Sequence, residues 1–167
     1  MVKPIFADFE GNKKGELFLL SVRHVGLTTT YILDERLAPL ADSKLANDFN
    51  LVVMDAEQAI NLLINRCRDG TPLAAYSQAE KDTLKNGFGI QVSDYLDMRK
   101  LAKKWINRYH KKEFEQLSTY KPKSKNLQDK SATWSLMAIA KWLNLGLPSK
   151  YARGKTTSRI NGIISGF

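Results

Sequence analysis

The sequence has one cysteine, no long apolar run and fewer acidic than basic residues, and each shortage excludes some classes of protein. Because Cys67 is alone among 167 residues, no internal disulfide can form, and no metal-ligand spacing surrounds it. No apolar run reaches the roughly 18 residues that would span a bilayer, and Met1–Pro4 lacks the apolar stretch of a signal peptide. We therefore expect a cytoplasmic protein with no membrane partner.

The shortage of acids leaves a strong positive charge. Lys and Arg total 26 against 17 Asp and Glu, for a net charge of +9 and a pI near 9.6. Such an excess favours a polyanionic partner, most often nucleic acid, either DNA or RNA. The apolar fraction of 43% suits a globular protein, and the length predicts a single domain over residues 1–167.

Local patterns predict the order of the elements. Three segments rich in apolar and β-branched residues are joined by short spacers, at 3–11, 15–26 and 28–35, which predicts an antiparallel meander. A strand over 71–77, following a crossover helix, should lie beside the first strand and parallel to it. The class expected is therefore α/β, a mixed sheet of three antiparallel strands and then parallel strands, flanked by helices. The remaining expected segments are a short helix over 40–49, a strand or loop over 50–55, a fifth strand over 89–94, and helices over 55–70, 78–88, 95–117, 131–148 and 154–167.

The segment PIFADFEGN, Pro4–Asn12, ends a buried strand with two acids. Residues two apart in a strand share a face, so Asp8 and Glu10 should point the same way and Phe9 into a core. Two carboxylates on one face either spread into water at the rim of a hairpin or share a cation. Glu80 and Asp82 follow the predicted fourth strand, where they are either metal ligands or acids favoured by a helix dipole.

The motif ADFEG and the order of elements resemble the ribonuclease-H-like 3′–5′ exonuclease superfamily, the DEDD or DnaQ-like group. That family has Asp-x-Glu at the end of its first strand, matched by Asp8 and Glu10. A second motif has an acid four residues before a Leu, where Glu80 precedes Leu84. A later Asp opens a helix with an Ala five residues on, matched by Asp97 in DMRKLAKKW, and SLMAIAKWLNLGLP is similar to the helix before the third motif.

The resemblance implies a metal-dependent 3′–5′ exonuclease acting on DNA or RNA, with a single strand or a strand end as the expected substrate. Its implied metal ligands are Asp8, Glu10 and Glu80, holding Mg²⁺ or Mn²⁺, with Asp97 as a further catalytic candidate whose position is largely structural in the family. The family's final Asp is missing, because Lys155 stands four residues after Tyr151 and no acid follows Asp129. The alternative is a catalytically weak or inactive module that binds nucleic acid or a protein partner.

Positive charge gathers toward the C-terminal end of the chain. On the helix predicted over 95–117, a basic stripe lies opposite Met98, Ala102, Ile106 and Tyr109. A stripe alone is usually a solvated face, but the concentration of charge favours a surface for phosphates, with two tyrosines as stacking candidates. The candidate nucleic-acid-binding residues are Tyr76, Lys100, Lys104, Arg108, Lys111, Tyr151, Arg153, Lys155 and Arg159.

Overall fold

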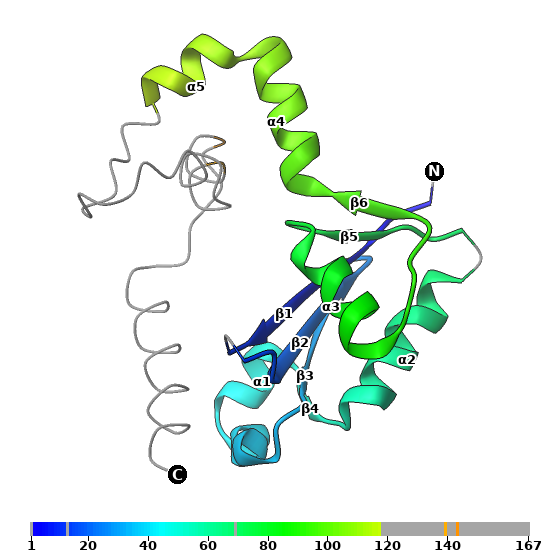
Figure 1. The fold of residues 1–167 in the computed structure, drawn as a ribbon. Coiled ribbons are helices and arrows are strands. Elements are labelled where there is room, and N and C mark those ends of the chain that lie inside the picture. Colours follow the sequence, from blue (N-terminus) through cyan, green and yellow to red (C-terminus); the bar gives the residue numbers. More distant parts are fainter. Residues whose placement is uncertain (1, 13, 69, 118–138, 140–142, 144–167) are drawn as a thin grey trace.

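A six-stranded mixed sheet lies at the centre of the computed structural model, which describes residues 2–12, 14–68 and 70–117 together with Ile139 and Leu143 (Figure 1). The strand order is β4-β3-β2-β1-β5-β6. The strands are β1 (Ile5–Gly11), β2 (Leu17–His24), β3 (Leu27–Ile32), β4 (Leu51–Val53), β5 (Leu73–Ala75) and β6 (Tyr95–Asp97). The helices are the 3-10 helix η1 (Glu35–Asp42), α1 (Leu45–Phe49), α2 (Ala56–Cys67), α3 (Ala79–Phe88), α4 (Met98–Tyr109) and α5 (Lys111–Leu117).

The strand pairing confirms the expected topology. Strands β1, β2 and β3 form an antiparallel meander. Strand β5 lies beside β1 in parallel, with Ile5 opposite Leu73, which places β1 in the interior of the sheet. Strands β4 and β6 extend the sheet in parallel at its two edges. The α/β class with a mixed sheet and flanking helices is therefore confirmed, whereas the finer ribonuclease-H-like assignment stays a prediction.

The main core lies between the sheet and the helices α2 and α3, which Figure 1 shows on the same side of it. Ile5 and Ala7 of β1 meet Ile60 and Leu63 of α2 and Leu84 of α3 there, all of them buried. Phe9 packs against the same cluster, as the alternation of β1 predicted. Asp8 and Glu10 therefore project from the other face of β1.

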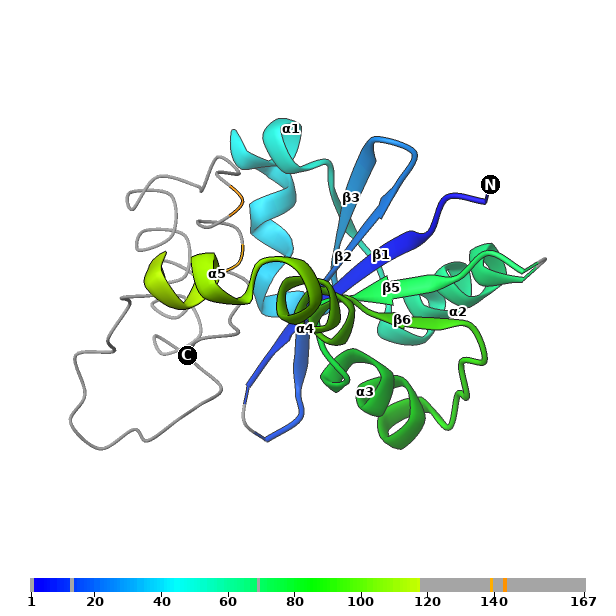
Figure 2. The same ribbon diagram turned by 90° about the horizontal axis from the view of Figure 1, so that it is seen from above.

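A smaller core joins α4 to the rest of the molecule. Ile106 of α4, Phe114 of α5 and Ile139 are buried together, with Ala102 and Tyr76 packed against them. Beyond β6, α4 extends away from the sheet (Figure 1; Figure 2, seen from above). No helix in the described part of the chain has the length and apolar composition needed to cross a bilayer.

Several element boundaries differ from the sequence expectation. The single helix predicted over 95–117 is wrong, because Tyr95–Asp97 pairs with β5 as a strand and α4 ends at His110, whose φ is −138°. No strand forms over 89–94, because that segment connects α3 to β6. The helix predicted over 40–49 is divided by Ser43, which is extended, into η1 and α1. The helix expected from Asp55 is α2, and the Asp55 side chain caps it as predicted.

Gly11 occupies an irregularity in the pairing of β1 with β2, where a side chain has no room. A Cβ there would lie 2.4 Å from the carbonyl oxygen of Glu16. We expect Gly11→Ala to lower the free energy of unfolding by about 1–3 kcal/mol, because the backbone must shift. Urea denaturation measures this change.

Gly87 provides a matched control within α3. A Cβ at Gly87 would meet no atom within 4 Å. Gly87→Ala should therefore raise the free energy of unfolding by about 0.5–1 kcal/mol, since alanine has the higher helix propensity. Equal effects of the two substitutions would contradict the close approach at Gly11.

Candidate functional site

Asp8 and Glu10 are exposed residues whose side chains share one face of β1. Among the residues that the structure describes, neither carboxylate has a hydrogen bond or an ion pair. The following turn is held instead by Asn12, whose Oδ1 atom accepts from the backbone N–H of Lys14 at 2.8 Å and of Glu16 at 3.1 Å. The two acids are thus not needed to close the hairpin, which weakens the interpretation of a simple rim pair.

Glu80 reaches this region from the first turn of α3. Its residue is only 9% exposed, and its Oε2 atom accepts from the Ser77 hydroxyl at 3.1 Å. Burial raises the pKa of the Glu80 carboxyl, hydrogen bonds from its own backbone N–H and from Ser77 partly offset this, and the charge of Asp8 raises the pKa further. The charge of Asp8 on β1 therefore acts on the Glu80 carboxyl of α3.

The pKa of Asp8 is also raised, first by burial of its carboxyl group and then by the charge of Glu10. Although the Asp8 residue as a whole is exposed, its carboxyl group lies low enough over the sheet to lose part of its hydration. Asp8 thus links Glu10 on its own strand to Glu80 on α3. Asp82, the alternative to Glu80, is exposed and accepts instead from the Gln78 amide at 3.4 Å.

Asp8, Glu10 and Glu80 are the type of ligand that binds a hard divalent cation, but their side chains are not arranged as a complete metal site. Carboxylate oxygens are the ligands that Mg²⁺ and Mn²⁺ prefer, and repulsion between Asp8 and its acidic neighbours would be relieved by a cation. Within the described ranges, however, no group of three or more His, Cys, Asp or Glu side chains is arranged to hold a metal ion. The metal site at Asp8, Glu10 and Glu80 therefore stays a prediction.

Asp97 has a structural task at the start of α4. Its Oδ1 atom accepts from the backbone N–H of Lys100 at 2.8 Å, which makes it the N-cap, and its Oδ2 atom lies 3.6 Å from the Lys100 ammonium. This agrees with the structural role that the resemblance implies for the position. Asp94, three residues earlier, lies before β6 and so does not cap α4.

Substitutions at Asp97 separate capping from metal binding. Asn caps helices as well as Asp does, so Asp97→Asn should leave the free energy of unfolding nearly unchanged, whereas Asp97→Ala should lower it by about 1 kcal/mol. Thermal denaturation measures both. If Asp97→Asn instead removed metal-dependent cleavage while keeping stability, Asp97 would be a ligand rather than a cap.

Two tyrosines belong to or contact the loop between β5 and α3: Tyr76 lies in the loop, and Tyr95 of β6 contacts it. The Tyr95 hydroxyl donates to the Ser77 carbonyl oxygen, and the pKa of Tyr95 is raised by burial and then by the charges of Glu80 and Asp97. Sequence patterns did not indicate Tyr95, because its contact depends on a residue 18 positions away. Tyr76, a stacking candidate, packs against the small core around Ile106, which favours a core role.

The basic stripe is exposed, as expected for a solvated or ligand-binding surface. Lys100, Lys104 and Arg108 lie on α4, and Lys111 begins α5. The predicted residues Tyr151, Arg153, Lys155 and Arg159 lie outside the described residues.

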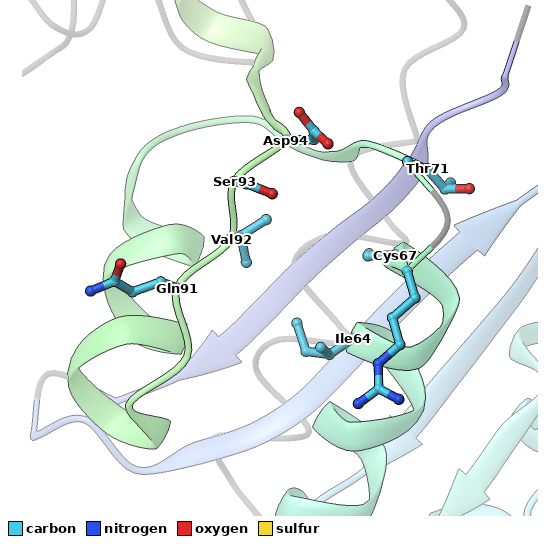
Figure 3. Close-up of a pocket in the computed structure, with 9 residues that line it drawn as sticks. Ile64, Cys67, Thr71, Gln91, Val92, Ser93 and Asp94 are labelled. Atoms are coloured by element: carbon cyan, nitrogen blue, oxygen red, sulfur yellow. The ribbon is translucent and has the colours of Figure 1, made fainter.

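A pocket of about 290 Å³ lies at the opposite end of the parallel strands (Figure 3). It opens between the end of α2 and the segment before β6, near the start of β5, whereas Asp8 and Glu80 lie near the ends of β1 and β5. None of the predicted site residues lines it. The lining residues are Ile64, Cys67, Arg68, Gly70, Thr71, Gln91, Val92, Ser93 and Asp94.

The candidate site thus consists of acids on β1 and α3, with Ser77 and Tyr95 behind Glu80. Its resemblance to ribonuclease-H-like exonucleases, which stays a prediction, depends on the motifs around Asp8, Glu80 and Asp97 and on the order of the strands. Neither a protein-family model nor a curated protein nor a solved structure matches the chain.

Proposed function

We propose that this protein is a metal-dependent 3′–5′ exonuclease-like protein that acts on DNA or RNA. The observation that carries the proposal is the parallel pairing of β1, which carries Asp8 near its end, with β5, which leads into α3 and the buried Glu80 in its first turn. It brings two acids from separate elements to the edge of the sheet where the parallel strands β1 and β5 end. The ends of parallel strands are where α/β proteins usually bind ligands.

Each acid has a distinct part in this proposal. Asp8, Glu10 and Glu80 would hold Mg²⁺ or Mn²⁺. When bound, such ions activate a water molecule and stabilise the leaving oxygen of a phosphodiester. Ser77 orients the Glu80 carboxylate through its hydroxyl, and Tyr95 holds the Ser77 backbone in turn.

A degradation assay with a single-stranded oligonucleotide labelled at its 5′ end tests the proposal. Attack from the 3′ end should give a ladder of shortening labelled products. We expect slow cleavage that is faster with Mn²⁺ than with Mg²⁺, because Mg²⁺ demands a nearly ideal octahedral site and the family's final acid is missing. EDTA should stop it. Release of the labelled 5′ nucleotide first, or no shortening with either metal, would contradict the proposal.

The second candidate is a module that binds nucleic acid without cleaving it. Two observations favour it: no three-ligand metal group forms among the described residues, and Lys155 stands where the family has its last Asp. If this alternative holds, the protein binds the labelled oligonucleotide at low salt, and the oligonucleotide keeps its length with either metal. Location in the cytoplasm stays a prediction in both cases.

A further inference from the structure

One side of α4 exposes a row of large apolar side chains. Leu101, Trp105 and Tyr109 are 46%, 43% and 59% exposed, and they follow one another at intervals of four residues. The prediction that Tyr109 lies with Ile106 opposite the basic stripe is therefore wrong. Residues four apart lie on the same side of a helix, about 6 Å apart along its axis. Burial in the small core does not account for this row, because α4 uses Ala102 and Ile106 for that contact.

A row of cations runs beside the apolar row. Lys100, Lys104 and Arg108 are exposed and have the same spacing, one residue before Leu101, Trp105 and Tyr109. The guanidinium carbon of Arg108 lies 5.2 Å from the centre of the Tyr109 ring, so charge and aromatic surface are in contact. The Lys100 ammonium is 3.6 Å from Asp97, yet its side chain remains 74% exposed.

The composition of this face favours a polyanion over an apolar protein surface. The segment MRKLAKKWINRY of α4 contains no Asp or Glu to balance its Lys and Arg residues. Proteins that bind single strands combine a positive surface for the phosphates with aromatic rings on which bases stack. The partly exposed Trp105 ring, which also packs against the His110 ring with the centroids 4.7 Å apart, and the exposed Tyr109 ring lie beside these cations and form this combination.

We infer that this face of α4, Leu101, Trp105 and Tyr109 with Lys100, Lys104 and Arg108, binds single-stranded nucleic acid. Bases stack on Trp105 and Tyr109, while the three cations contact phosphates. The choice of nucleic acid as the ligand rests on the proposed function, but binding at this face does not require that the protein cleave the strand.

The face is placed to lead a strand to the acids. Helix α4 begins directly after Asp97, and the backbone N–H of Arg99 in its first turn donates at 2.9 Å to the carbonyl oxygen of Tyr76, which precedes the Ser77 that donates to Glu80. The start of α4 therefore lies near the Glu80 side of the candidate site. From there the 12 residues of α4 extend for about 18 Å.

Fluorescence anisotropy of a labelled oligothymidine, measured in EDTA at low salt, tests binding without cleavage. Trp105→Ala and Tyr109→Ala should each weaken binding about fivefold or more, since each removes a stacking ring. Trp105→Phe should retain most of the affinity because a ring remains. Phe49→Ala, which removes an exposed aromatic side chain from α1, is the matched control and should bind like the unmodified protein.

The salt dependence of the same titration tests the cations. Replacing Lys100, Lys104 and Arg108 by Gln should make the slope of log affinity against log salt shallower by about 2, at about 0.7 for each lost phosphate contact. Unchanged affinity in the Trp105→Ala, Tyr109→Ala double variant would overturn the inference. An absence of oligothymidine binding at low salt would also overturn the inference. If ultracentrifugation then showed self-association through α4, this face would be an interface between copies of the protein. Binding as expected, with no shortening of the strand in Mn²⁺, would overturn only the exonuclease proposal.

Discussion

Asp8→Asn should lower any Mn²⁺-dependent cleavage by at least about a hundredfold. Asp8 interacts with Glu10 on one side and with Glu80 on the other, so it is the acid that a shared cation would need most. A bound metal supplies several kcal/mol of charge stabilisation, and each 1.36 kcal/mol is tenfold in rate. The rate of shortening of a 5′-labelled oligonucleotide measures the loss, and calorimetry with Mn²⁺ measures the accompanying loss of metal affinity.

The same variant should be slightly more stable than the unmodified protein when no metal is present. Because the folded protein raises the pKa of Asp8, ionisation of this group opposes folding, and Asn removes that opposition. The gain should be absent at about pH 3, below the ordinary pKa of Asp, and should develop as the pH rises through the raised pKa. It should stay below about 1 kcal/mol because Asp8 is partly hydrated.

Asp82→Asn is the matched control for both measurements, because Asp82 is an exposed acid on α3 two residues from Glu80. It should leave cleavage and its metal dependence unchanged. If Asp8→Asn destabilised the protein at neutral pH and left cleavage intact, the two β1 acids would belong to the hairpin and not to a metal site.

Leu84→Ala should lower the free energy of unfolding by about 2–5 kcal/mol. Leu84 is 0% exposed and anchors α3 in the main core, so truncation leaves a cavity that the surrounding elements can only partly fill. Urea denaturation followed by circular dichroism measures the loss. Leu62→Ala on α2 removes the same atoms from a side chain that is 39% exposed, and it should cost less than about 1 kcal/mol.

Leu84→Ala also tests how Glu80 is positioned, because both residues belong to α3. We expect cleavage per folded molecule to fall in this variant, since a loosened α3 no longer holds Glu80 near Asp8. Equal losses of stability in Leu84→Ala and Leu62→Ala would contradict the burial that holds α3 in place.

The sequence by itself determined the features that depend on near neighbours in the chain. The alternation in β1 correctly put Phe9 in the core and Asp8 with Glu10 on the other face. The capping signal of Asp55 correctly marked the start of α2, and the meander with β5 parallel to β1 followed from element order. These signals can be recognised in the sequence because side-chain periodicity and capping act over a few residues.

The tertiary structure decided what depends on distant segments. Pairing with β5 makes Tyr95–Asp97 a strand where helical periodicity predicted a helix, and burial of Glu80, whose pKa the charge of Asp8 also raises, distinguishes it from the exposed Asp82. The exposure of Trp105 beside a cationic row likewise depends on which side of α4 meets the small core. Spacing along the chain shows which side chains share a face, but only packing against other elements decides which face is buried.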